Sequence, residues 1–374
     1  MPVSAVALTQ ELIRFNTVNP PGDEQPCAAH LARILESAGF AVELVPFGEQ
    51  RAQLIARVGG NPDKPPLCFT GHLDTVPLGK QPWTHDPFAA AITDGRVYGR
   101  GSSDMKSGVA AFVAAAVDLA SRLRDTPGLV LVLTAGEETG CAGAFDLARR
   151  PDLLGRAGAL VVAEPTGNRP LVGHKGALWL KAETRGVTAH GSMPEKGVNA
   201  IYRAAHAIAA LEAFTFETPP HAVLGAPTLS VGTIAGGLNI NSVPDHCAIG
   251  IDIRTIPGQD NRRIRAAIAR LLGADAALEA VLDVASVWTD PDEPWMAAAA
   301  ATAQKVTGEA APIAAAPFFT DASALKPALG DPPTIILGPG ELALAHQTDE
   351  YCRTDRIEAV TAIYTALICS WCVV

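Results

Sequence analysis

Four short apolar runs along the chain have the length and composition of buried β-strands. They are PPLCFTG (65–71), GLVLVLTAG (128–136), GALVVAEPTG (158–167) and PTIILGPG (333–340). Continuous apolar strands are typical of a largely parallel sheet that is covered on both faces. Helical patterns at 106–121 and 141–149 separate the first three runs. Strands that alternate with helices predict an α/β layered domain.

Residues 177–287 follow a different pattern. The segment 177–186 alternates apolar and polar positions like a half-exposed strand, 198–214 has helical spacing, and 226–237 and 246–257 are again strand-like. A helix with Asp260 as its N-cap is expected over 260–273, and a strand over 276–288. This β-α-β-β-α-β order predicts an inserted ferredoxin-like α+β domain at 177–287. The first domain would then consist of 1–176 and 288–374.

Size and composition agree with two globular domains. The 374 residues exceed what one hydrophobic core usually holds, and 48% are apolar while 18% are charged. The net charge of -10 argues against nucleic acid as the main partner. The N-terminus has no basic leader, and the most apolar helical segment, GVAAFVAAAVDLA, is too short to span a bilayer. We therefore expect a cytoplasmic protein without a membrane partner.

The seven cysteines are scattered and odd in number, as expected of buried, reduced thiols. The C-terminal CSWC could in principle form a redox or metal pair. It has no second pair and no βαβ context, so we favour the structural interpretation.

Polar side chains that can bind metals follow each buried run. They are His72, Asp74, Glu137, Glu138, Glu164 and His346, with Asp104 just before the helix at 106–121. Ligands bind at the carboxyl ends of the strands in open α/β sheets. Imidazoles together with carboxylates suit zinc, with cobalt or manganese as substitutes. One zinc needs three protein ligands, so five or more donors predict two divalent ions that share a bridging carboxylate.

Each residue also has an ordinary interpretation. A lone histidine is more often a core or surface residue than a ligand, two adjacent glutamates usually form a solvated pair, and Asp104 could be only a helix cap. The metal interpretation is favoured because the acids and imidazoles all fall at strand ends.

Several segments resemble the successive motifs of the dinuclear zinc aminoacylase and carboxypeptidase family, peptidase M20. They are NTVNPPGDE, GHLDTVP, PWTHDPF, YGRGSSDMKSG, AGEETG, AEPTG and GPGELALAHQTDEY. That family includes acetylornithine deacetylase, succinyl-diaminopimelate desuccinylase, aminoacylases and glutamate carboxypeptidases. The resemblance implies a zinc-exopeptidase-like α/β/α catalytic domain whose inserted domain serves as a lid and forms a homodimer.

The resemblance also implies a role for each residue of the site. His72 and Glu164 would hold one zinc ion, Glu138 and His346 the other, and Asp104 would bridge them. Asp74 would orient the imidazole of His72 through its other nitrogen, as carboxylates behind metal ligands commonly do. Glu137 would be the general base for a metal-bridged hydroxide.

The inserted domain would supply three more residues. The segment GVTAHGSMP resembles the family segment whose histidine, His190 here, reaches the active site of the partner subunit and stabilises the oxyanion. GGLNINSVPD supplies Asn241. In DIRTIPG, Arg254 would clamp the substrate α-carboxylate, and a salt bridge with Asp252 is the alternative.

The predicted reaction is hydrolysis of the amide bond of an N-acyl-L-amino acid. The last motif, together with HKG and GVNAIYRA, resembles acetylornithine deacetylase most. The segment FFTDAS (318–323), which we expect to line a specificity pocket, departs from the deacetylase pattern. Succinyl-diaminopimelate desuccinylase is therefore the second candidate, and a carboxypeptidase or dipeptidase acting on short peptides the third. A non-catalytic scaffold on the same fold and a dinuclear phosphatase are more remote alternatives.

Overall fold

The computed structural model describes residues 3–60, 63–310 and 312–374. The chain divides into two compact units. The first comprises residues 1–173, 288–316 and 320–374, and the second comprises 174–287 and 317–319. Residues 317–319 thus cluster with the second unit, whereas the sequence placed them in the first.

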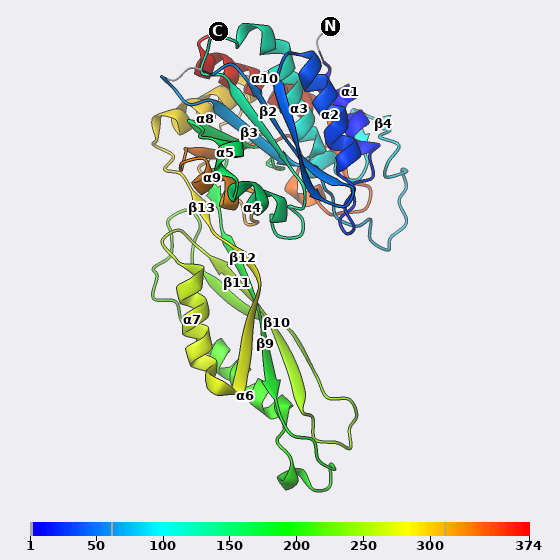
Figure 1. The fold of residues 1–374 in the computed structure, drawn as a ribbon, viewed down its shortest axis with the longest axis vertical. Coiled ribbons are helices and arrows are strands. Elements are labelled where there is room, and N and C mark those ends of the chain that lie inside the picture. The colour runs from blue at the N-terminus through cyan, green and yellow to red at the C-terminus, as the bar shows by residue number, and fades with distance from the viewer. Residues whose placement is uncertain (1–2, 61–62, 311) are drawn as a thin grey trace. The chain divides into compact units, whose positions relative to one another are not determined.

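A six-stranded sheet in the order β1-β2-β6-β3-β7-β14 forms the centre of the first unit (Figure 1). Its strands are β1 (Ala41–Gly48), β2 (Arg51–Val58), β3 (Leu67–His72), β6 (Leu129–Thr134), β7 (Ala159–Val162) and β14 (Thr334–Ile336). The last four are the predicted apolar runs, they are parallel to one another, and every residue in them is buried. The expectation of a buried, largely parallel sheet is confirmed.

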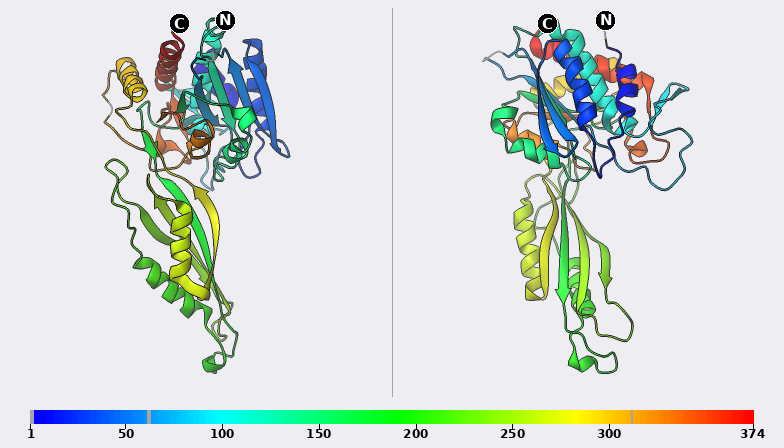
Figure 2. Two further views of the ribbon diagram at one scale, coloured as in Figure 1. Left: turned by 60° about the vertical axis from the view of Figure 1, so that its left-hand side comes forward. Right: turned by 45° about the vertical axis from the view of Figure 1, so that its right-hand side comes forward.

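Helices cover both faces of this sheet (Figure 2). One group packs together around the Ala-rich, almost fully buried α3. It consists of α1 (Ala5–Ile13), α2 (Gln25–Ser37), α3 (Ser107–Leu119), α8 (Pro294–Thr307) and α10 (Thr354–Cys372). The other group is α4 (Ala142–Ala148), α5 (Pro151–Leu154) and α9 (Ala322–Ala328). The α/β/α architecture is therefore confirmed.

The structure also contains short strands that the apolar pattern did not predict. A three-stranded antiparallel sheet consists of β15 (Tyr351–Arg353), β5 (Arg96–Tyr98) and β4 (Ile92–Thr93). A separate pair consists of β8 (Gly173–His174) and β13 (Val287–Trp288). The strand expected over 276–288 therefore ends earlier, and its last two residues belong to β13.

The second unit has the predicted β-α-β-β-α-β order. Its strands are β9 (Gly176–Arg185), β10 (Thr228–Gly236), β11 (His246–Thr255) and β12 (Ala276–Val284), arranged as β10-β11-β9-β12. The helices α6 (Ala200–Glu212) and α7 (Asn261–Leu272) contribute Ala200, Leu211 and Ile268 to one core with strand residues such as Ile249. Both helices lie on the same face of the sheet (Figure 2).

Local signals explain why α7 forms where it does. Asp260 is the N-cap and accepts a hydrogen bond from the amide of Arg262 at 2.9 Å. Buried Ile264, Ile268 and Leu272 recur every fourth residue, so one face of the helix lies on the sheet. The predicted cap is confirmed.

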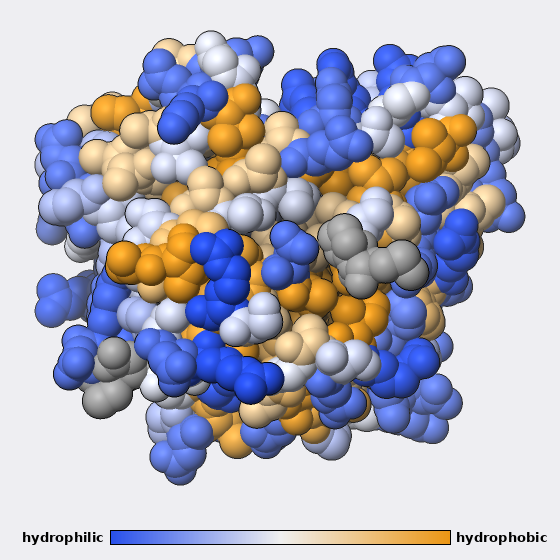
Figure 3. Space-filling model, turned by 90° about the horizontal axis from the view of Figure 1, so that it is seen from above, coloured by the Kyte–Doolittle hydropathy of each residue, from blue (hydrophilic) through white to orange (hydrophobic). Residues whose placement is uncertain are grey.

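All seven cysteines are unpaired, including both in the CSWC segment, which lies at the end of α10. One face of the molecule mixes hydrophilic and hydrophobic residues, with the hydrophilic ones spread across it (Figure 3). Such a mixture is ordinary for the surface of a folded protein.

Candidate metal centre

The four parallel strands bring the predicted ligands to one edge of the sheet. His72 is the last residue of β3, and Glu164 follows β7 by two residues. Glu138 lies in the loop after β6, and His346 in the loop after β14. Asp104 lies in an irregular turn, η1 (Ser102–Lys106), that leads into α3. Parallel strands end side by side, so residues far apart in the chain meet here.

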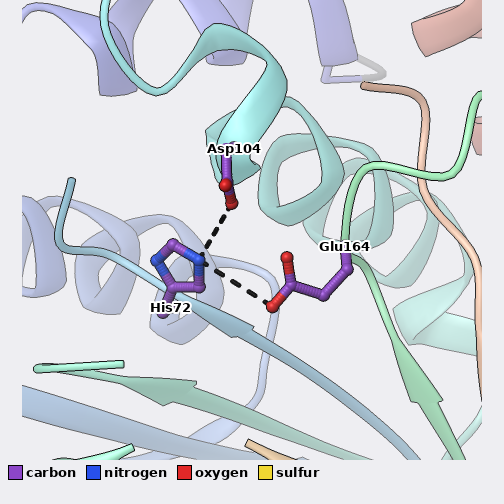
Figure 4. Close-up of side chains that lie close together, drawn as sticks. All are labelled: His72, Asp104 and Glu164. Atoms are coloured by element: carbon purple, nitrogen blue, oxygen red, sulfur yellow. Dashed lines mark hydrogen bonds and ion pairs between the residues drawn. The ribbon is translucent and has the colours of Figure 1, made fainter. Parts of the chain in front are cut away.

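The first group of donors is His72, Asp104 and Glu164, whose ligand atoms all lie within 4.8 Å of one another. Figure 4 shows the carboxylates of Asp104 and Glu164 facing the same nitrogen of the His72 imidazole. His72 Nε2 is 3.2 Å from Asp104 Oδ1 and 3.9 Å from Glu164 Oε1. Three N and O donors at this spacing can bind one divalent ion.

The second group, Asp104, Glu138 and His346, shares its carboxylate with the first. His346 Nε2 is 3.4 Å from Asp104 Oδ2 and 3.2 Å from Glu138 Oε2. The two oxygens of Asp104 therefore face two different histidines. A carboxylate in this position is placed to bridge two ions.

The electrostatics of the metal-free groups are those of a cation site. Burial raises the pKa of Glu164 well above its ordinary value, with a further contribution from the charge of Asp104. Burial also raises the pKa of Glu138. Burial alone would raise the pKa of Asp104 too, but hydrogen bonds from His346 and His72 hold it well below its usual range. Three buried acids at one point need positive charge, which two imidazoliums or two metal ions can supply.

The donor set therefore fits a pair of divalent ions. Oxygen and imidazole nitrogen are the ligands that zinc and its borderline neighbours accept. Glu138 Oε1 is buried and has no hydrogen-bond partner among the described residues, so it is a further available donor atom. A buried carboxylate oxygen without a partner is costly unless something binds it.

The ordinary interpretations of these residues do not match the structure. Helix α3 has Lys106 at its N-cap position and no side-chain cap, so Asp104 does not cap it. Glu137 and Glu138 are not a solvated pair, because their side chains are almost fully buried. His72 is buried too, but its Nε2 faces acids and not a core.

Asp74 supports the site in two ways. Its main-chain carbonyl accepts a hydrogen bond from His72 Nδ1 at 2.9 Å, while its carboxylate Oδ1 lies 3.6 Å from the same nitrogen. The carbonyl is thus the nearer orienting group for the imidazole, and Nε2 is left for a ligand role. The carboxylate accepts the amides of Glu137 and Glu138 at 3.1 and 3.2 Å. It also accepts Asn19 Nδ2 at 2.9 Å, which gives the NTVNPPGDE motif a structural role that the sequence did not specify.

Glu137 lies next to the two groups but belongs to neither. Its side chain is buried, and its Oε1 faces the thiol of Cys141 at 3.7 Å. Burial raises its pKa well above the ordinary value of a glutamate, against the lowering effect of His72. A carboxylate with a raised pKa beside a metal pair is suited to accept and return a proton.

A family model for "Peptidase family M20/M25/M40" matches residues 68–370. The chain belongs to this family. It is accordingly a metal-dependent hydrolase, as the sequence predicted.

Two curated relatives of this M20 hydrolase have different names. The acetylornithine deacetylase of Proteus mirabilis (strain HI4320) is 33% identical over 361 residues, which cover 91% of this chain and 89% of the relative. The succinyl-diaminopimelate desuccinylase of Stenotrophomonas maltophilia (strain K279a) is 34% identical over 381 residues, which cover 96% and 97%.

Solved structures share the fold of this M20 chain. An M20 family metallo-carboxypeptidase from Sulfolobus solfataricus superposes with a TM-score of 0.82 at 18% identity, covering 97% of this chain and 98% of the other. A dinuclear metal-binding M20 peptidase from Bacillus subtilis gives 0.71 at 16% identity, covering 97% and 96%.

Three predicted site residues of the M20 chain lie in its second unit. His190 and Asn241 are exposed and sit on adjacent segments, where the Gly191 amide donates to the Asn241 carbonyl at 2.7 Å. Arg254 Nε is 3.0 Å from Asp252 Oδ1. This is the salt bridge that the sequence left open as an alternative. The roles of all three in binding substrate stay predictions.

The 318–323 segment is mostly buried. The side chain of Asp321 is buried and accepts a hydrogen bond from the hydroxyl of Thr134 in β6. Of this segment, only Phe318 and Phe319 are partly exposed, and Phe319 contacts Trp179 edge to face at 6.4 Å. The role of this segment in substrate specificity stays a prediction.

The described parts of this M20 chain, residues 3–60, 63–310 and 312–374, contain no helix with both the length and the apolar character to cross a bilayer.

Without metal, the stability of this M20 protein should fall as the pH rises from about 6.5 to about 10. Hydrogen bonds with Asp104 and Glu138 raise the pKa of His346 to about 10. A raised histidine pKa stabilises the fold fully below the unfolded value of about 6.5, and this contribution is lost as the pH rises through the folded value. Thermal melting in chelator at pH 6.5, 8 and 10 measures the loss. In the His346→Gln variant the melting temperature should depend less on pH. An equal pH dependence in both proteins would show that His346 is not the cause.

Proposed function

We propose that this chain hydrolyses the amide bond of N-acyl-L-amino acids, with acetylornithine as the first candidate substrate and two zinc ions as its metals. The proposal rests on the carboxylate of Asp104, whose oxygens lie 3.2 and 3.4 Å from the Nε2 atoms of His72 and His346. Cobalt or manganese would be substitutes in a site of this composition. When bound, the ions would polarise the substrate carbonyl and activate a water molecule.

Glu137 acts as the general base in this proposal. Its Oε1 already faces the thiol of Cys141, so Oε2 is the atom available to take a proton from water and return it to the leaving amine. Asp74 holds the amides of residues 137 and 138, and thereby fixes the base beside the ligand Glu138.

The second unit would bind the ends of the substrate. Arg254 is the proposed clamp for the α-carboxylate, because a guanidinium binds a carboxylate with two parallel hydrogen bonds. Binding requires the substrate to compete with Asp252, the present partner of Arg254. His190 of the partner subunit would stabilise the oxyanion, with Asn241 as a further polar contact. These roles imply a homodimer through the second unit.

The two curated relatives suggest different acyl groups for the substrate of this chain. The deacetylase of Proteus mirabilis and the desuccinylase of Stenotrophomonas maltophilia are similar to this chain at 33% and 34% identity. Desuccinylation is therefore the second candidate, and hydrolysis of short peptides the third. All three reactions would be cytoplasmic, and the first two would belong to amino-acid biosynthesis.

A substrate panel tests the proposal. The zinc-loaded full chain is assayed with N-acetylornithine, other N-acetyl-amino acids, N-succinyl-diaminopimelate and dipeptides. We expect kcat/KM for N-acetylornithine to exceed that for the succinyl substrate at least about tenfold, which is about 1.4 kcal/mol of transition-state binding. A preference for the succinyl compound would select the second candidate. Full zinc loading with no hydrolysis of any of these compounds would favour a scaffold.

A further inference from the structure

Glu350 lies at the centre of a compact hydrogen-bond network beside the metal centre. Its side chain is fully buried, and Arg100 Nη1 donates to Oε2 at 2.7 Å. The same carboxylate accepts three main-chain amides, those of Gly101 at 3.0 Å, Ser103 at 2.7 Å and Asp104 at 3.0 Å. One side chain thus binds three main-chain amides of the turn that carries Asp104.

That turn has little regular structure of its own to hold it. Gly101 has a φ of 82°, and Asp104 has φ and ψ of -121° and 94°, outside the helical region. Amides in such a turn lack the partners that a helix or a sheet would give them, and a buried amide without a partner is costly. The carboxylate of Glu350 supplies those partners, and it determines where the backbone of Asp104 lies.

The network also fixes the turn relative to the loop that carries His346. Glu350 follows His346 by four residues in that loop. Arg100 donates to the carbonyls of Gln347 and Pro77, both at 3.2 Å. Pro77 ends the motif that begins at Gly71 and contains His72. The ion pair of Glu350 and Arg100 therefore connects the segments that carry His72, Asp104 and His346.

We propose that Glu350 is a positioning residue for the metal pair. Through the amides of residues 101, 103 and 104 it holds Asp104 where each carboxylate oxygen meets one histidine. The hydrogen bonds of its carboxylate go to Arg100 and to main-chain amides and not to a ligand side chain, so it acts through the backbone of Asp104. This inference rests on the proposed dinuclear function and adds to it a residue outside the two donor groups.

A second buried ion pair offers a matched control. Glu24 is also fully buried, and Arg51 binds it with Nη2 at 2.6 Å and Nε at 2.9 Å. Glu24 accepts no amide from a segment that carries a ligand among the described contacts. Glu24→Gln therefore removes a comparable buried charge without releasing the turn at 101–104.

The experiment compares the full-length wild type with E350Q and E24Q. Each protein is stripped with a chelator and titrated with Zn²⁺ in competition with a chromophoric chelator, and the Co²⁺ form is examined by visible absorption. We expect E350Q to lose about 10–100-fold in affinity for at least one zinc ion, the range typical of changes behind a ligand. Its cobalt spectrum should change as well. E24Q should stay within about twofold of wild type, even where both variants melt at a similarly lowered temperature.

Wild-type zinc affinity in E350Q, or an equal loss in both variants, would overturn the inference. If E350Q does not fold, E350D replaces it, because the shorter side chain keeps a charge for Arg100 but cannot reach all three amides. E350D should then lose zinc affinity, and wild-type binding would again overturn the proposal. Failure of the wild type to bind two ions would refute the dinuclear function itself, and is seen before any variant is compared.

Discussion

Replacing Glu137 by glutamine is expected to lower kcat by about 10²–10⁴-fold while both metal ions stay bound. The side chain belongs to neither donor group, and glutamine has nearly the same volume, so the metal ligands should not move. What disappears is a group that can accept a proton. Steady-state kinetics on the preferred substrate, together with the metal content of the purified variant, measure both effects.

Two further variants make the result specific. Glu138→Gln alters a donor that lies 3.2 Å from His346, so it should lose metal as well as activity. Glu36→Gln changes an exposed residue of α2 and should leave both unchanged. Activity close to wild type in the Glu137 variant would reject this residue as the base.

Replacing Asp104 by asparagine should affect metal binding more than any other single change. It removes the one charge that both donor groups share, and an amide presents one oxygen where the carboxylate presents two. We expect the metal content to fall from two ions per chain to one or fewer. The loss of affinity should exceed the 10–100-fold that is typical of changes behind a ligand, and activity should fall with it.

Metal analysis after equilibrium dialysis, followed by assays over a range of zinc concentrations, tests this expectation. Asp118→Asn is the control, because Asp118 is an exposed residue of α3, the helix that follows the turn with Asp104. Two tightly bound ions in the Asp104 variant would exclude a bridging role for this carboxylate.

The strongest hydrophobic signals predicted the parts of the fold that position the site. Strands β3, β6, β7 and β14 are continuous apolar runs because both of their faces are covered, and such runs stand out in a sequence. The acids and imidazoles that follow the ends of these strands were the candidate ligands, and the structure places their ligand atoms within a few ångströms of one another. The order of elements in the second unit could also be predicted, because its helices and strands have clear hydrophobic periodicities.

Other features depend on contacts that no local pattern contains. The edge strand β1 is exposed at five of its eight positions, and β4 has only two residues, so neither gives a strong signal. Asn19 and Glu350 are single polar residues whose partners lie at least 55 residues away in the chain. Both occur in quoted motifs, but the identity of their partners follows only from the folded backbone.

The long sequence separation between Glu350 and the early metal donors has a consequence for biosynthesis. His72, Asp104 and Glu164 are all synthesised in the first half of the protein, yet the network that fixes the turn at 101–104 is completed by a residue about 190 positions after Glu164. At translation rates of 5–20 residues per second, that interval is about 10–40 s. A nascent chain would therefore expose its early donors before it could hold an ion firmly. Firm metal loading would therefore follow the synthesis of the segment that carries Glu350.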